Sequence, residues 1–245
     1  MKIMKIRLFA SMSSATIIAS IAGVALFTTP TIAYSADSPT DFDRKIMESS
    51  GLTAEEMRDY AERDTRLMQE VIEENKSELD KYSPLGEDRE NAPTLGEVGE
   101  IWVSTFGNSS GSLTIVGHAA IVSNKPEVTI EAYPDFNSPI GKDGVQEYPN
   151  TWRSRDGGKI LLGNKVSSLK KRQGAAAWAE SKIGTSYWIN VHNKYDISRM
   201  YCSQLVWYAW LTQGNDIDYI KWDTIVTPAE IAKSSATTIL WGTLG

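Results

Sequence analysis

The sequence contains one cysteine, Cys202, and two histidines, His118 and His192, among 245 residues. A single cysteine excludes an intrachain disulfide, although exported proteins with several cysteines commonly pair them. The spacing of these three residues does not match a zinc site. The glycines form neither a Walker-type nor a dinucleotide-binding pattern. We therefore expect no metal and no other cofactor.

Basic residues are also few, with 25 Lys and Arg against 31 Asp and Glu, giving a formal net charge of −6. If residues 1–35 are removed, three basic residues and no acidic ones are lost, and the charge becomes −9. A strongly acidic chain is a poor partner for nucleic acids or anionic lipid surfaces. We expect no nucleic-acid partner.

The first 35 residues have the organisation of a signal peptide. Lys2, Lys5 and Arg7 precede an uncharged, largely apolar run from Leu8 to Phe27. A short stretch of small residues follows, and Ala33-Tyr34-Ser35 fits a cleavage site. The pattern predicts export, so that the mature protein is secreted or lies at the cell surface. The alternative is an uncleaved membrane anchor, because the apolar run approaches the length of a bilayer span.

Residues 36–95 predict a helical arm followed by a linker. Thr53 and Glu56 form a capping box, and apolar residues recur behind it at helical spacing. The helix is expected to end near Lys81, ahead of a polar linker at 86–94. Its narrow apolar stripe must pack on another element. The arm is either a structural appendage or a cover for a cleft.

Residues 96–245 predict a single α+β domain. Strands are expected at 100–104, 113–123, 128–133, 159–162 and 237–241, where short apolar or β-branched runs lie between turn residues. Helices are expected at 168–182, from Cys202 to near Gly214, and from Pro228 to about Ser234. The segment 134–158 contains many prolines and glycines and predicts irregular loop.

Cys202 is predicted to lie in the first turn of its helix. Leu205, Val206 and Ala209 follow it at offsets of three, four and seven, which places all four residues on one helix face. Free backbone N–H groups and the helix dipole favour a thiolate at this position. The alternative is an inert cysteine in the core.

A thiol nucleophile requires a base and a group that orients the base. If the strands at 113–123 and 128–133 form a hairpin centred on Asn124-Lys125, His118 lies directly opposite Glu131. Opposed side chains share a face of the sheet, and a carboxylate beside an imidazole fixes its tautomer. The alternative is a structural histidine. His192, in a polar loop, is best explained as a solvated side chain.

These motifs together resemble a known family. Gly-His-Ala-Ala-Ile-Val at 117–122, Glu131, Tyr-Cys-Ser-Gln-Leu-Val at 201–206 and Thr-Pro-Ala-Glu at 227–230 are similar to the circularly permuted papain-like cysteine hydrolases, the YiiX/YycO-like branch of the NlpC-type superfamily. The resemblance implies a permuted papain-like fold in which an antiparallel sheet packs against the helix carrying the cysteine. It covers roughly residues 97–241.

The resemblance also implies roles for individual residues. Cys202 would be the nucleophile, His118 the general base and acid, and Glu131 the orienting group. Tyr187 and Trp188, in a segment similar to one in the family, and Gly117, beside the histidine, would contact the substrate. The implied activity is cleavage of an amide bond, with cell-wall peptide as the substrate. The alternatives are hydrolysis or transfer of lipid acyl groups, and a ligand-binding module without turnover.

Overall fold

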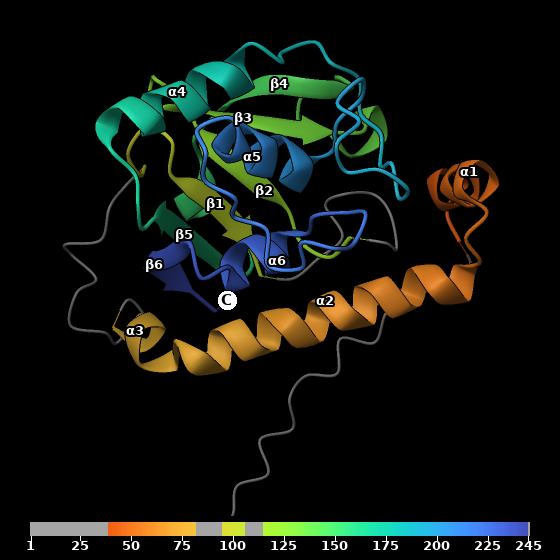
Figure 1. Ribbon diagram of the computed structural model, residues 1–245, viewed down its shortest axis with the longest axis horizontal. Helices are drawn as coiled ribbons and strands as arrows, with labels where there is room; N and C mark the ends of the chain where they lie inside the picture. Colours follow the sequence, from red (N-terminus) through yellow and green to blue (C-terminus); the bar gives the residue numbers. More distant parts are fainter. Residues whose placement is uncertain (1–38, 82–94, 106–114, 245) are drawn as a thin grey trace, which may run out of the picture. The chain divides into compact units, whose positions relative to one another are not determined.

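The computed structural model describes residues 39–81, 95–105 and 115–244 (Figure 1). These residues fall within one contact unit that begins at Ser38. The predicted signal peptide, residues 1–35, lies outside the described residues, as does most of the predicted linker. In the described ranges, no helix is both long enough and apolar enough to cross a bilayer.

The centre of the fold is a six-stranded antiparallel sheet with the order β4-β3-β2-β1-β5-β6. Helices flank this sheet, and the prediction of an α+β fold is confirmed. The strands are β1 (Ile101–Ser104), β2 (Ala119–Val122), β3 (Val128–Tyr133), β4 (Gly144–Pro149), β5 (Lys159–Asn164) and β6 (Thr237–Thr243).

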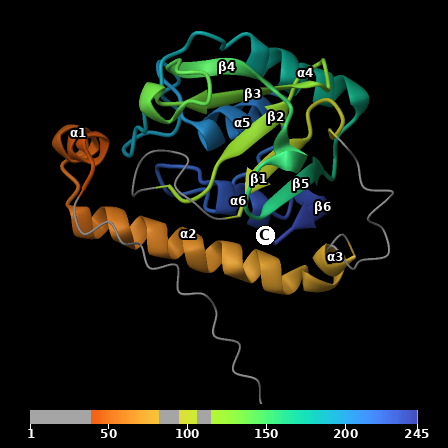
Figure 2. The same ribbon diagram turned by 180° about the vertical axis from the view of Figure 1, so that it is seen from behind.

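Three helices pack on one face of this sheet. They are α4 (Leu169–Glu180), α5 (Cys202–Leu211) and α6 (Pro228–Lys233). Helix α5 contacts β2 and β3, and α6 contacts β1 and β6. Figure 1 shows α5 in front of these strands, and Figure 2 shows the same strands from behind with α5 beyond them. The helix that begins at Cys202 therefore lies directly on β2, which begins immediately after His118, and on β3, which carries Glu131.

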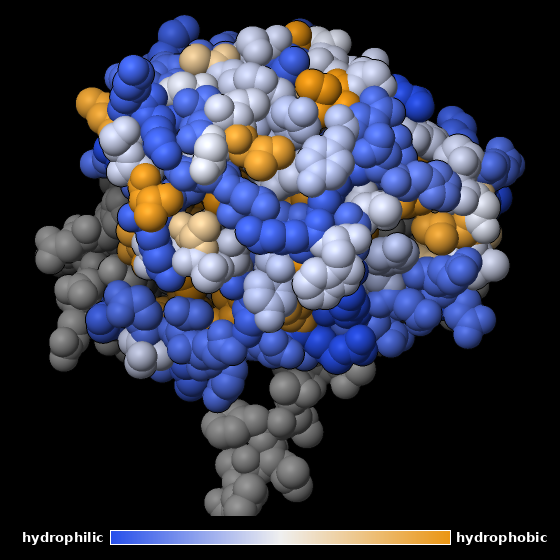
Figure 3. Space-filling view, viewed as in Figure 1, coloured by the Kyte–Doolittle hydropathy of each residue, from blue (hydrophilic) through white to orange (hydrophobic). Residues whose placement is uncertain are grey.

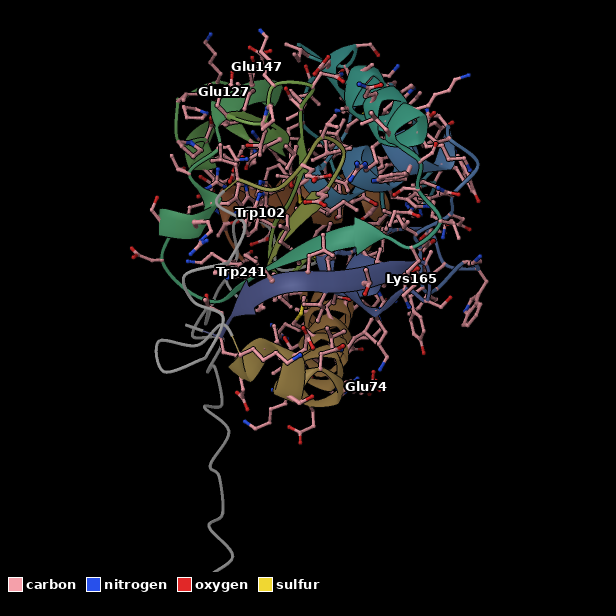
Figure 4. The ribbon with its side chains drawn as sticks, turned by 90° about the vertical axis from the view of Figure 1, so that its left-hand side faces the viewer. Glu74, Trp102, Glu127, Glu147, Lys165 and Trp241 are labelled. Carbon is pink, nitrogen blue, oxygen red and sulfur yellow. The ribbon has the colours of Figure 1, made fainter. Side chains whose placement is uncertain are left out.

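The opposite face of the sheet carries a tryptophan-rich core. Trp102 stacks on Trp152 at a ring distance of 5.9 Å and meets Trp241 edge-on at 5.7 Å. Figure 4 shows Trp102 and Trp241 close together at one end of the sheet. Trp152 belongs to the 3-10 helix η3 (Trp152–Ser154), in a segment predicted to be irregular loop. A further 3-10 helix, η2 (Asp135–Asn137), follows β3.

The predicted register of the β2–β3 hairpin was wrong by two residues. Ile121 pairs with Ile130 and Val122 with Thr129, so Glu131 lies opposite Ala120 and not opposite His118. The turn is centred one residue later than predicted, because the chain turns through Lys125-Pro126, with Ser123 N–H bonded to the Val128 carbonyl at 3.0 Å. A shift of two residues preserves the face on which each side chain lies. Glu131 therefore remains on the face predicted for it.

Two further sequence predictions need correction. The strand expected over 113–123 is confined in the described residues to β2, because Gly117 has φ +83° and interrupts the extended backbone before it. The segment 134–158, predicted to be irregular, contains β4, which pairs with β3 along six residues. The two large apolar residues of β4, Val145 and Tyr148, are three positions apart, so the strand lacks the period of two that would separate it from its proline- and glycine-rich surroundings.

The arm consists of α1 (Asp41–Ser50), α2 (Ala54–Glu74) and α3 (Lys76–Asp80). The Thr53–Glu56 capping box is present, and the predicted helix to Lys81 is divided at Asn75. Helix α2 packs along α6. The side chain of Arg63 lies between Asp223 and Glu230, 3.1 Å and 3.2 Å from their carboxylates. The arm is therefore attached by the partly buried Arg63–Asp223 ion pair as well as by its apolar stripe.

The outer surface on the side of α4 and α5 is mostly hydrophilic, and its hydrophobic residues form separate spots (Figure 3). This distribution agrees with the strongly acidic composition of the chain.

Candidate active site

Cys202 is the first residue of α5, as the sequence predicted, and its side chain is fully buried. The preceding residue, Tyr201, has an extended conformation and makes no side-chain capping hydrogen bond. Its hydroxyl instead accepts a 2.9 Å hydrogen bond from the Val226 N–H. The backbone N–H groups of the first turn of α5 are thus left without a side-chain cap from Tyr201, beside the only thiol of the chain.

His118 immediately precedes β2 and is held by its backbone. Its N–H donates to Ser104 Oγ at 2.7 Å, and its carbonyl accepts from the Ser104 N–H at 3.0 Å. A Cβ at Gly117 would lie 2.6 Å from the Ser104 carbonyl oxygen. Gly117, which the sequence predicted to contact the substrate, therefore lies closely against the backbone of β1.

Glu131 reaches His118 across the hairpin on the diagonal. Its Oε2 lies 2.9 Å from His118 Nε2, and both side chains are buried. The residue nearest to the position opposite His118 is Tyr133, whose ring stacks on the imidazole at a centroid distance of 4.0 Å. The sequence correctly brought His118 and Glu131 together, although the register that led to this prediction was wrong.

Glu131 also accepts hydrogen bonds from four neighbouring side chains. Arg155 binds both carboxylate oxygens, at 2.9 Å and 2.7 Å. The other donors are Thr129 Oγ1 at 2.5 Å, Tyr133 Oη at 3.1 Å and Trp152 Nε1 at 3.2 Å. Burial alone would raise the pKa of the Glu131 carboxyl, but His118 and Arg155 outweigh it and hold that pKa well below its usual range. Glu131 is therefore ionised at any ordinary pH.

Cys202 and His118 shift each other's proton affinity. Burial by itself raises the pKa of the Cys202 thiol, but the charge and hydrogen bonding of His118, helped by the Ala119 N–H, bring the net pKa below its usual value. Burial lowers the pKa of His118, and interactions with Cys202 and Glu131 raise it above its usual value. Both shifts favour a thiolate–imidazolium pair.

The geometry of the imidazole is consistent with this pairing. Nε2 is engaged by Glu131, and Nδ1 is buried with no partner within ordinary hydrogen-bond geometry. Because the carboxylate occupies one ring nitrogen, Nδ1 is the atom available to exchange a proton with the thiol.

Tyr187, predicted to contact substrate, is buried close enough to Cys202 that the thiolate charge, after burial itself, helps raise the pKa of its phenol. Trp188 lies one residue further, with the Arg199 guanidinium 4.8 Å from its ring centre. Both rings touch Phe42 of α1, at 5.9 Å and 5.8 Å. Phe42 also contacts Phe136 at 5.3 Å. The arm therefore covers the aromatic side chains that were predicted to face the substrate.

His192 is exposed in a loop, where its backbone N–H is bonded to Asn190 Oδ1 at 3.0 Å. Among the residues that the structure describes, no three His, Cys, Asp or Glu side chains are grouped so that they could hold a metal ion.

Sequence reasoning missed the side chains that hold Glu131. Thr129, Glu131 and Tyr133 alternate along β3, and this period of two places them on one face. That signal was available. Trp152 and Arg155 follow in a segment without periodicity, and only the fold brings them back to β3.

No protein-family model matches this sequence, and no curated protein matches it either. A solved structure described as the metalloprotein YiiX from Escherichia coli O157:H7 is similar over 60% of this chain and 97% of that chain, at 18% sequence identity and a TM-score of 0.46.

Proposed function

We propose that this protein is a thiol hydrolase of the permuted papain-like kind that cleaves an amide bond through an acyl-enzyme. The observation that carries the proposal is the buried series Cys202, His118, Glu131, in which the carboxylate is fixed by Arg155. A nucleophile, a base and a group that orients the base are the three parts that such chemistry requires.

The proposed reaction has two stages. The Cys202 thiolate attacks the carbonyl carbon, and the backbone N–H groups at the start of α5 stabilise the developing oxyanion. The His118 imidazolium then protonates the leaving nitrogen as the C–N bond breaks, which gives a thioester. In the second stage, His118 removes a proton from water, which attacks the thioester and releases the acid and the thiol.

Glu131 would keep the reaction in one geometry. Because its carboxylate accepts from Nε2, the imidazole retains a proton on that atom, and Nδ1 is the nitrogen that gains and loses a proton. The negative charge also stabilises the imidazolium formed in each stage.

The substrate class rests on the predicted export of the chain and on its resemblance to NlpC-type enzymes, which together favour cell-wall peptide. Hydrolysis or transfer of lipid acyl groups is the alternative chemistry for the same residues. The thiol is fully buried in the structure, so either substrate would reach it only after a covering group moves.

The test is turnover of purified peptidoglycan fragments, with product masses measured, by the wild-type protein and by Cys202→Ala. Cleavage of one peptide bond in the fragments by the wild type and not by Cys202→Ala supports the proposal. Acyl lipids are incubated in parallel. If neither substrate is changed in a Cys202-dependent manner, and the thiol titrates like free cysteine, the protein is a binding module of this fold and the proposal is wrong.

A further inference from the structure

A cavity of about 180 Å³ lies against His118 on the tryptophan-rich face of the sheet. Pockets that enclose a whole drug-sized ligand measure about 300–1,000 Å³, so this space accommodates one functional group of a larger molecule. Its lining is polar and aromatic: Ser104, His118, Tyr133, Trp152, Arg155, Asp156, Gly158 and Lys159.

Lys159 is the unusual member of this lining. It is the first residue of β5, paired with Ser104 of β1, and only 7% exposed. Its ammonium donates to the backbone carbonyl of Arg155. Within the described residues, no carboxylate lies within ion-pair distance of it. A buried ammonium without a counter-ion is costly, and it persists only where something compensates.

Lys194, the other buried lysine among the described residues, shows the contrast. Lys194 is 2% exposed, and its ammonium lies beside the carboxylates of Asp218 and Asp223. Lys194 is therefore paired with carboxylates, whereas Lys159 lines a cavity. Burial also lowers the pKa of Lys159, and Arg153 and Arg155 act in the same direction, against Asp156. An anion bound beside Lys159 would offset both the cost of burying its ammonium and the repulsion from Arg153 and Arg155.

The segment around Lys159 is locally basic in an acidic chain. Arg153, Arg155 and Lys159 occur within seven residues, with Asp156 as the only acidic member, and Asp156 is exposed. Glu131 binds both His118 and Arg155, so Lys159 is the basic side chain of the lining that has no carboxylate partner among the described residues. A positive group in a cavity with low-dielectric walls attracts anionic ligands.

We propose that this cavity binds an anionic group of the substrate, a carboxylate or a phosphate, through the ammonium of Lys159. The proposal rests on the thiol hydrolase function inferred above and specifies its substrate: a molecule that carries a negative charge close to the bond that is cut. Because His118 lines the same cavity, the bound anion would hold the scissile bond near the imidazole.

The first experiment compares matched esters. The substrates are the mono-4-nitrophenyl ester of glutaric acid, its neutral methyl ester, and the 4-nitrophenyl ester of 3-phosphonopropionic acid, each corrected for its reactivity toward hydroxide and with Cys202→Ala as the blank. We expect the wild type to prefer an anionic ester at least tenfold in kcat/KM. Charge-assisted hydrogen bonds are worth about 1.5–3 kcal/mol, or roughly 10- to 100-fold.

Lys159→Met should reduce this preference to about one, and Lys159→Arg should retain part of it. The control is Lys165→Met, an exposed lysine just beyond the other end of β5, far from Trp241 in Figure 4, which should behave like the wild type. Thermal melting verifies that each variant is folded. A wild-type ratio near one, or an unchanged ratio in a folded Lys159→Met, overturns the proposal. Preference for the carboxylate ester points to peptide substrates, and preference for the phosphonate points to phospholipids.

A second experiment needs no turnover. The Cys202→Ala protein is titrated calorimetrically with glutarate and with methylphosphonate at low salt, alongside the double variant with Lys159→Met. Binding of either anion that is lost with Lys159 supports the anion site even if no ester is hydrolysed, in which case the proposed hydrolase function fails alone. Equal binding by both proteins, or binding by neither, overturns the anion site.

Discussion

Glu131 contacts His118 from the diagonal position of the hairpin, while Tyr133 occupies the position beneath the imidazole. The arrangement lets one strand supply both the carboxylate at Nε2 and the aromatic surface that supports the ring. Stacking on Tyr133 fixes the plane of the imidazole, and the hydrogen bond to Glu131 fixes its Nε2 edge. Nδ1 is then the ring nitrogen left to exchange a proton with the thiol.

The thiolate–imidazolium pair predicts unusual reactivity at low pH. Iodoacetamide should label Cys202 at pH 6 at a large fraction of its rate at pH 8, whereas an ordinary thiol of pKa about 8.5 is almost entirely protonated at pH 6. The lowered pKa of Cys202 and the raised pKa of His118 define the range in which the pair exists. His118→Ala should slow labelling at pH 6 about tenfold or more, with His192→Ala as the matched control. Labelling that follows an ordinary thiol titration in both proteins would contradict the pair.

Glu131→Gln should lower kcat/KM by about 10²- to 10⁴-fold, by analogy with loss of the orienting carboxylate in serine hydrolases. The amide can also offer an N–H to donors such as Trp152 and Arg155, so stability should fall as well. Glu147→Gln, an exposed residue of β4 labelled in Figure 4, is the control. Hydrolysis rates and thermal unfolding are measured together. A Glu131→Gln protein that unfolds earlier but reacts at the wild-type rate would remove the carboxylate from the mechanism.

The buried carboxyl groups around Arg63 predict loss of stability as pH rises. Burial raises the pKa of Asp64 to about 7, despite Arg63, and burial with the charge of Asp223 raises that of Glu230 to about 9. The unfolded carboxyls release their protons near pH 4. Between these values the folded state holds protons that the unfolded state has lost, so the free energy of unfolding falls with increasing pH.

Asp64→Asn should flatten this dependence, reducing the difference in unfolding free energy between pH 5 and pH 8 by about 1–3 kcal/mol. Chemical denaturation at several pH values measures it. Asp59→Asn, exposed on the same helix, should leave the slope as in the wild type. A slope that is the same in all three proteins would show that Asp64 is ionised in the folded state.

Phe42 connects the arm to the site. Phe42→Ala removes the ring that packs on Tyr187 and Trp188, and we expect α1 to detach more often. Iodoacetamide labelling of Cys202 should then accelerate severalfold at fixed pH, because the thiol is reached only when its cover opens. Lys45→Ala, exposed on α1, is the control. Unchanged labelling in Phe42→Ala would make the arm a structural appendage, the alternative that the sequence left open.

Local chemistry made much of this fold readable from the sequence. The capping box at Thr53, the start of the last helix at Pro228 and the start of the cysteine helix were predicted correctly, because each depends on residues within one helical turn. The hairpin register was predicted wrongly, because the turn through Pro126 lies one residue later than expected and shifts the pairing by two residues. Arg155 could not be assigned a role from the sequence, because its partner Glu131 is 24 residues away and only the sheet brings the two together.

Leu79 of α3 fits closely against Gly242 of β6, so removal of the arm would also uncover this edge of the sheet. A Cβ on Gly242 would lie 2.5 Å from Leu79 Cδ2, so the glycine leaves space for the leucine. β6 is an edge strand of the sheet. A truncated protein lacking the arm would expose β6 and the space beside Gly242 to other molecules. Uncovered edge strands pair readily with one another. Such a fragment would be prone to self-association, and its lower yield or activity would not by itself reveal what the arm does.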